Sequence, residues 1–138
     1  MRCRLSVPCE LSATYTGNGK LFKRAVTLGS EISRQGKGLF SGVPSNITFV
    51  PAHAGHGLVF QRIDIPGAPL IPATLDNVKG TPRCTVLGEG HASIQTVEHL
   101  LAALAAYGVD NLLIKIDAPE VPIFDGSSLA FIDMIENA

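Results

Sequence analysis

Short runs of apolar and polar residues, partly alternating, fill the chain between residues 25 and 87, and glycines, prolines and small polar residues separate them. Runs of this length that are rich in Val, Ile, Phe and Thr are typical of β-strands. We expect strands at residues 26–32, 46–50, 57–64, 70–75 and 83–87. The glycines of segment 36–42 suit a tight connection, because glycine accepts positive φ angles.

The apolar spacing changes to a helical period at residues 95–108. The apolar stripe consists of Val97, Leu100, Leu101, Leu104 and Tyr107. Thr96 is a suitable residue to cap this helix at its start, and Gly108 can end it in the left-handed conformation. A further strand at 112–116 and a second helix at 127–138, which Ser127 can cap, complete the pattern. We expect an α+β fold in which helices cover one face of one sheet.

Composition and charge narrow the class of protein. The length of 138 residues suits one domain, and the 46% of hydrophobic and 17% of charged residues are typical of a globular protein. A net charge of −1 argues against a nucleic-acid partner. No apolar run approaches the ~20 residues that span a bilayer, so we expect no stable membrane insertion. The three cysteines are odd in number and form no Cys-x-x-Cys pair, which favours a reducing compartment. We therefore expect a cytoplasmic protein.

The first 24 residues differ in composition from the rest. They hold five of the eleven Lys and Arg residues and a single acid, Glu10, and they lack a long apolar run. Such a segment is not a secretory signal, but it can be an organelle transit peptide, a disordered leader or the result of a misassigned start codon. We therefore expect a basic, disordered leader at 1–24 and a domain at 25–138.

Glu98 and His99 stand side by side at the start of the predicted helix, off its apolar stripe. With Thr96 as the cap they would be its second and third residues. The helix dipole favours a carboxylate there and disfavours a charged imidazole, and neutral imidazole is the form that binds metal. The alanines around His99, at 102, 103 and 106, either let another surface approach closely or simply favour helix formation.

Three other features are candidates for chemistry. The glycine spacing of segment 36–42 does not match the dinucleotide-binding fingerprint. His53 and His56 have a spacing that suits either a separate zinc site or a solvated loop. Asp117, Glu120 and Asp125 cluster near prolines, where acids often form turns or cap helices.

Three ordered motifs resemble a known family: TVEHL (96–100), GVDN (108–111) and EVPIFDGS (120–127). They are similar to those of the UDP-3-O-acyl-N-acetylglucosamine deacetylases, the zinc hydrolases of lipid A biosynthesis. Weaker agreement extends upstream to residue 26. The resemblance implies a two-layer α/β sandwich like the second domain of ribosomal protein S5.

The resemblance also implies a site. His99 would be a Zn²⁺ ligand and Glu98 the general base for the water that attacks the acetamide of UDP-3-O-acyl-N-acetylglucosamine. Asp125 and Thr96 would be supporting residues. Zinc acidifies water and stabilises an oxyanion, which suits the hydrolysis of an amide.

The sequence departs from the family in two respects. The family has a second domain that supplies the other zinc ligands through an H-K-x-x-D motif, which is absent here. We therefore expect a half-enzyme, inactive alone, with a separate second domain as its partner. Phe40 stands where family members usually carry histidine. The alternatives are a non-catalytic homologue that binds a partner through the alanine face, and a nucleic-acid module, which the lack of a basic patch outside the leader disfavours.

Overall fold

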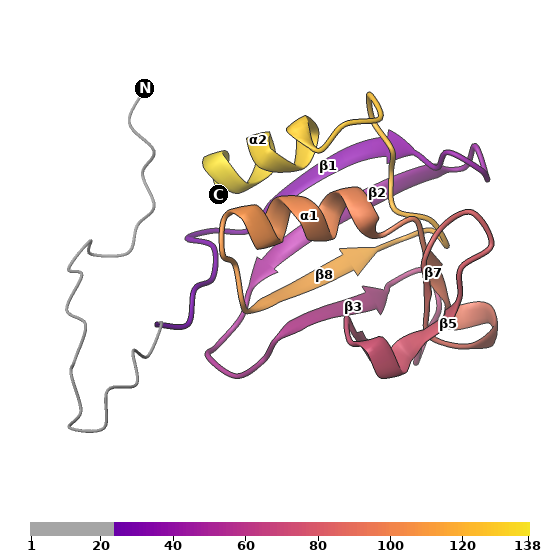
Figure 1. The fold of residues 1–138 in the computed structure, drawn as a ribbon, viewed down its shortest axis with the longest axis horizontal. Helices are drawn as coiled ribbons and strands as arrows, with labels where there is room; N and C mark the ends of the chain where they lie inside the picture. The colour runs from indigo at the N-terminus through magenta and orange to yellow at the C-terminus, as the bar shows by residue number, and fades with distance from the viewer. Residues whose placement is uncertain (1–23) are drawn as a thin grey trace.

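The computed structural model describes residues 24–138. The leader predicted at 1–24 lies outside the described residues except for Arg24, as do Cys3 and Cys9. Figure 1 shows two helices packed on one face of a twisted sheet. The helices are α1 (Glu98–Ala106) and α2 (Leu129–Asn137). The strands are β1 (Ile32–Lys37), β2 (Pro44–Pro51), β3 (Leu58–Arg62), β4 (Leu70–Pro72), β5 (Val78–Gly80), β6 (Val86–Leu87), β7 (Ile94–Gln95) and β8 (Leu112–Ile116). Short 3-10 helices span Leu75–Asn77 and Gly90–Ala92.

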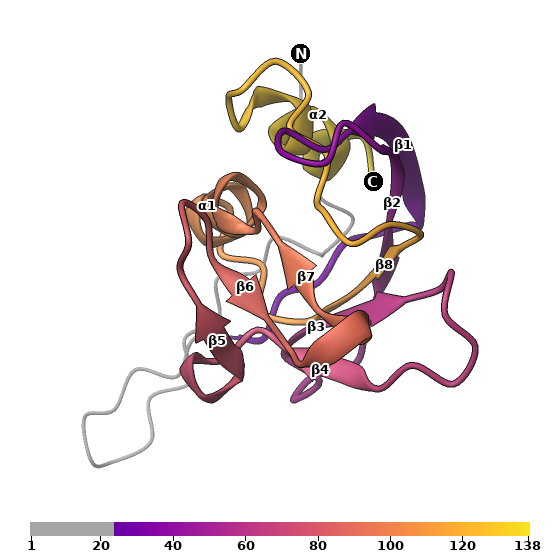
Figure 2. The same cartoon turned by 90° about the vertical axis from the view of Figure 1, so that its right-hand side faces the viewer.

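The large sheet has the order β1-β2-β8-β3-β4. The strand β8 lies at its centre, antiparallel to β2 and parallel to β3. Its register aligns Ile114 with Phe49 on one side and Phe60 on the other, and all three side chains are fully buried. A smaller sheet, β5-β6-β7, lies beside β3 and β4 and below α1 (Figure 2).

The core lies between the large sheet and the two helices, where their apolar faces pack together. Alternate residues of the central strands face the helices, because side chains of a strand point to opposite faces in turn. The fully buried set includes Ile47, Phe49, Phe60, Leu112, Ile114 and Ile116 from the sheet and Leu100, Leu104, Phe131, Met134 and Ile135 from the helices. Each such side chain contributes roughly 1.5–3 kcal/mol by leaving water.

The predicted α+β class, with helices on one face of the sheet, is confirmed. Strand 112–116 has the predicted bounds, β2 contains the predicted strand 46–50, and the predicted strand 57–64 contains β3. Segments 70–75 and 83–87 form only the short strands β4 and β6. The second, small sheet was not predicted, because its strands are two or three residues long and carry too few positions to show alternation.

The strand predicted at 26–32 is wrong. Residues 24–31 are irregular, and the first strand is β1, over the polar segment that follows. The carbonyl of Val26 accepts the backbone N–H groups of Asp110 and Asn111, so this segment is held by the end of the α1–β8 connection rather than by a strand ladder. β1 carries one large apolar residue, Ile32, so the polar sequence of this edge strand did not predict a strand.

Gly108 ends α1 as predicted. Its φ is 65°, its N–H donates to the carbonyl of Ala105 at 3.1 Å, and the N–H of Val109 donates to the carbonyl of Leu104 at 3.0 Å. This pair of bonds is a Schellman motif, which satisfies carbonyls that the helix leaves open. Within the described part of the chain, neither helix is long and apolar enough to cross a membrane.

Candidate functional site

Glu98 and His99 are the first two residues of α1. The prediction that Thr96 caps this helix is wrong, because Val97 occupies the cap position and makes no side-chain cap bond. Thr96 has a φ of 62°, and its hydroxyl donates to Oε1 of Glu120 at 3.0 Å instead. Glu98 and His99 thus lie one position nearer the helix start than predicted, still within the turn where the dipole acts.

The carboxylate of Glu98 is exposed and held by the small sheet. Its Oε1 accepts the backbone N–H of Thr85, the residue before β6. Burial acts to raise the pKa of Glu98, but the hydrogen bonds from Thr85 outweigh it and hold the pKa below its usual value. The side chain is therefore a fixed, charged carboxylate at neutral pH that can accept a proton.

His99 is half-buried, and its ring nitrogen Nδ1 is buried without a hydrogen-bond partner among the described residues. Buried ring nitrogens are normally paired, so residues 24–138 do not use this one to stabilise the fold. The backbone of His99 is fixed, because its carbonyl accepts the hydroxyl of Ser128 at 2.9 Å. A held backbone and an unsatisfied imidazole fit a metal ligand.

The side chains near His99 do not form a metal site with it. Residues 24–138 contain no group of three or more His, Cys, Asp or Glu side chains that could hold a metal ion. His53 and His56 form a perpendicular ring contact with centroids 5.5 Å apart, and each Nδ1 lies 3.0 Å from a backbone carbonyl of its own turn. These two histidines are therefore engaged in the loop after β2.

Asp125 is exposed and organises the turn before α2. Its Oδ1 accepts the backbone N–H of Ser127 at 3.0 Å and the Ser127 hydroxyl at 2.8 Å, and these bonds lower the pKa of Asp125. Ser127 accepts the N–H of Leu129 at 3.1 Å, so it supports the helix start, although Ser128 holds the cap position. Ser128 then bonds to His99. Asp125 is thereby linked to α1 through two serines.

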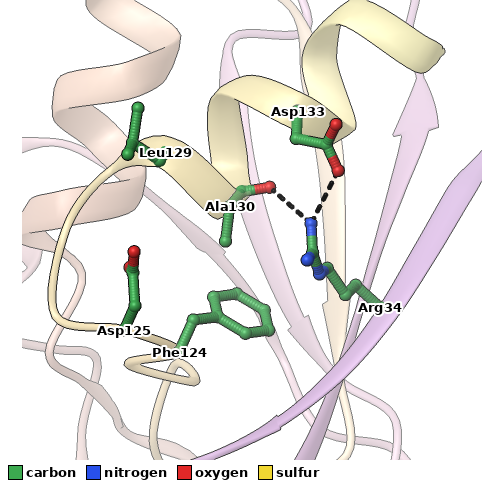
Figure 3. Close-up of a pocket in the computed structure, with 6 residues that line it drawn as sticks. All are labelled: Arg34, Phe124, Asp125, Leu129, Ala130 and Asp133. Atoms are coloured by element: carbon green, nitrogen blue, oxygen red, sulfur yellow. Dashed lines mark hydrogen bonds and ion pairs between the residues drawn. The ribbon is translucent and has the colours of Figure 1, made fainter.

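A pocket of about 390 Å³ opens beside this turn, and Figure 3 shows the side chains that line it. Arg34 reaches across from β1 and donates to Asp133 at 2.8 Å and to the Ala130 carbonyl at 3.3 Å. Its guanidinium also lies 5.3 Å from the ring centre of Phe124. The pocket is therefore closed on one side by an ion pair that ties β1 to α2.

The alanines around His99 do not form one open face. Ala103 is 1% exposed and belongs to the core, whereas Ala102 and Ala106 are exposed. The predicted close-approach surface is thus reduced to two alanines.

Sequence reasoning missed the role of Glu120. Its side chain is fully buried and accepts hydrogen bonds from Thr96 and from the loop between β1 and β2. The sequence did carry one indication that Glu120 is buried: it lies between the apolar residues Ala118 and Val121, which are buried too.

The sequence of the chain is similar to those of known proteins. The sequence model of the LpxC family, UDP-3-O-acyl N-acetylglycosamine deacetylase, matches residues 25–138. The chain is 49% identical over 109 residues to the UDP-3-O-acyl-N-acetylglucosamine deacetylase of Trichormus variabilis. The matched segment covers 79% of this chain and 39% of the relative. It is 48% identical over 110 residues to the bifunctional enzyme LpxC/FabZ of Porphyromonas gingivalis, covering 80% of this chain and 24% of that relative.

The chain thus has an α+β fold in which a hydrogen-bonded carboxylate lies next to an imidazole whose Nδ1 has no partner among the described residues. The chain belongs to the UDP-3-O-acyl N-acetylglycosamine deacetylase family. It spans about two fifths of the length of the Trichormus variabilis relative and about a quarter of the Porphyromonas gingivalis one.

Proposed function

We propose that this chain supplies the first part of a zinc-dependent deacetylase that hydrolyses the N-acetyl group of UDP-3-O-acyl-N-acetylglucosamine in lipid A biosynthesis. The family membership and the printed names of the relatives support the reaction. The observation that carries the assignment of residues is the buried, unpartnered Nδ1 of His99 next to the fixed carboxylate of Glu98.

In this proposal His99 is a zinc ligand and Glu98 is the general base. When bound, zinc supplies acidified water and polarises the acetamide carbonyl. Glu98 accepts a proton from the attacking water, and the Thr85 N–H holds its carboxylate in one orientation. Asp125 supports His99 through Ser127 and Ser128, and Thr96 supports the start of the same helix.

The proposal includes an incomplete site. A catalytic zinc normally has three protein ligands, and His99 is one. The remaining ligands would come from a separate second domain, so the isolated chain would be inactive and would hold no zinc tightly. We place the protein in the cytoplasm, or in an organelle if residues 1–24 act as a transit peptide.

Reconstitution tests this function. The chain is mixed with the remaining part of the Trichormus variabilis deacetylase, and bound zinc and acetate release are measured. We expect the mixture to retain zinc and release acetate, while Glu98→Gln keeps zinc and loses acetate release, and His99→Ala loses both. A mixture that neither retains zinc nor releases acetate contradicts the proposal.

A second candidate is a non-catalytic homologue that binds a partner. Two observations favour it: Phe40, at the position where histidine is expected, is 49% exposed, and Ala102 and Ala106 leave part of α1 open. This candidate predicts that the two parts associate without zinc and that restoring histidine at position 40 does not produce acetate release.

A further inference from the structure

Glu120 is a buried charge whose position the proposed reaction does not explain. Its side chain is 0% exposed, and every donor to it from the described residues is neutral. Oε1 accepts the Phe40 N–H at 3.0 Å and the Thr96 hydroxyl at 3.0 Å, and Oε2 accepts the Ser41 N–H at 2.8 Å. Burying a carboxylate is costly unless it is fully hydrogen-bonded, so these bonds make up for the loss of water.

The hydrogen bonds to Glu120 have a larger effect on its pKa than its burial has. Desolvation acts to raise the pKa of Glu120, whereas the bonds from Ser41, Phe40 and Thr96 lower it below its usual value. The group is therefore an acceptor only, which suits three donors that all point at it.

Thr96 is held in an unfavourable conformation by this carboxylate. A φ of 62° is rare for a β-branched residue, because it brings the Cβ close to the following carbonyl oxygen. Such strain persists only where the surroundings impose it, and it concentrates at functional sites. Here the surroundings are the Glu120 carboxylate on the side chain and the Thr85 carbonyl, which accepts the Thr96 N–H at 3.1 Å.

The same contacts reach the proposed base. Thr85 accepts from Thr96 through its carbonyl and donates to Glu98 through its N–H. Thr96 lies two residues before Glu98 and sets the direction in which the chain enters α1. A displacement of Thr96 therefore moves both the helix start and the group that orients Glu98.

The connection between β1 and β2 is fixed by the same side chain. A Cβ on Gly38 would lie 2.2 Å from Oε2 of Glu120, so only glycine lets the loop pass this close. Oε1 accepts hydrogen bonds from both the Phe40 N–H and the Thr96 hydroxyl. The loop between β1 and β2 is therefore held directly beside the residues that precede α1.

We infer that Glu120 is a positioning residue: its carboxylate holds Thr96 in the left-handed conformation and fixes the loop at residues 38–42 against it, which sets the placement of Glu98 and His99. The inference rests on the proposed function for its catalytic consequence, but its geometry is independent of that function.

Three variants test it: one at Glu120 and a matched pair at Thr96. Glu120→Gln keeps the size of the side chain but replaces one accepting oxygen by an NH2 group, which then faces at least one of the three donors. Thr96→Val keeps the shape but removes the hydroxyl. Thr96→Ser is the control, since it keeps the hydroxyl. The reporter in the 138-residue chain is the Thr85 amide proton, which the Glu98 carboxylate moves downfield in the NMR spectrum.

We expect Glu120→Gln and Thr96→Val to move the Thr85 signal upfield, and Thr96→Ser to leave it in place. In the reconstituted mixture, kcat should fall roughly 10–100-fold in the first two variants with a smaller change in KM, as for other groups that orient a catalytic residue. Thr96→Ser should retain kcat.

An unchanged Thr85 signal in Thr96→Val, together with unchanged kcat, overturns the inference. If Glu120→Gln does not fold, as judged by circular dichroism, the Thr96 pair decides alone. If the unsubstituted mixture releases no acetate, the proposed function fails, and the Thr85 signal still decides whether Glu120 positions Glu98.

Discussion

Arg62 and Glu120 are the charged residues that the described part of the chain buries, with 5% and 0% of their surface exposed. Arg62 binds Asp64 through two nitrogens, at 2.8 and 2.7 Å, and donates to the carbonyls of His91 and Ser93 at 3.2 and 2.9 Å. A guanidinium suits this role because it offers five donors in a rigid plane. It ties the end of β3 to the turn that leads into β7.

The first prediction concerns Asp64. The hydrogen bond from Arg62 lowers the pKa of Asp64 further than burial raises it. A depressed folded-state pKa contributes stability that is present above the unfolded value, near 3.8, and is lost as the pH falls through the folded value. We expect Asp64→Asn to cost about 1–2 kcal/mol at pH 7. This difference from the unsubstituted chain should shrink below about pH 4.

Urea unfolding at pH 7, 5 and 3 measures this difference. A gap that is as large at pH 3 as at pH 7 would show that the Arg62–Asp64 ion pair is not its source.

The second prediction concerns His99. Because the fold leaves its Nδ1 unpaired, His99→Ala should change the free energy of unfolding by less than about 1 kcal/mol. The neighbouring Leu100 is 0% exposed, and Leu100→Ala should cost about 2–5 kcal/mol. Chemical denaturation of the two variants compares them, and an equal loss in both would mean that His99 is a structural residue.

At the scale of elements, the two ends of α1 differ in how they are determined. The helix ends at Gly108, where the N–H groups of Gly108 and Val109 donate to the carbonyls of Ala105 and Leu104. These contacts are local, so the sequence could predict them. The start depends on Glu120, which is 24 residues away from Thr96. Local spacing suggested that Thr96 would cap the helix, but a long-range carboxylate takes its hydroxyl instead.

The strands also differ in whether local sequence or long-range pairing determines them. Segment 112–116 was predicted with its correct bounds because it is central and strongly apolar. The sequence of segment 26–32 resembles a strand more than the sequence of β1 does. β1 nevertheless forms the strand, because its backbone pairs with β2 even at polar residues such as Ser33 and Gln35. Glu98 and His99 were predicted as site residues from their motif, and this stays a prediction. The contacts of Glu98 with Thr85 and of Ser128 with His99 could be found only from the tertiary structure.

The third prediction concerns the end of α1. Gly108 has a φ of 65°, so Gly108→Ala should destabilise the chain by about 1–2 kcal/mol. Gly80 is the matched control: its φ is not positive, and an added Cβ would only touch Pro82 at 3.5 Å. Thermal unfolding should show a lower Tm for Gly108→Ala and little change for Gly80→Ala. Equal Tm values for the two variants would contradict the role of the Schellman motif.

At the scale of the whole molecule, the candidate site is assembled where separate parts of the chain meet. The segment between β5 and β6 supplies Thr85, and helix α1 supplies Glu98 and His99. The segment between β8 and α2 supplies Glu120 and Asp125. None of these side chains lies in the strands of the large sheet, which serve as the platform under α1 and α2 (Figure 1). The platform is therefore expected to be the most stable part.

The fourth prediction follows from this arrangement. Amides of β8, which is paired on both sides, should exchange with deuterium only through global unfolding, whereas amides of the edge strand β4 should exchange through local opening. Hydrogen exchange followed by NMR measures both. Equal protection of β4 and β8 would contradict the view that the sheet is most stable at its centre.

The central place of β8 also has a consequence during protein synthesis. Both of its neighbours, β2 and β3, leave the ribosome first, and the chain between β3 and β8 takes roughly 2–10 s to be made. For that time each neighbour carries an open row of N–H and C=O groups beside apolar side chains such as Phe49 and Phe60, a combination that invites aggregation. Both open edges are covered only when β8 is made, so aggregation competes with folding until then.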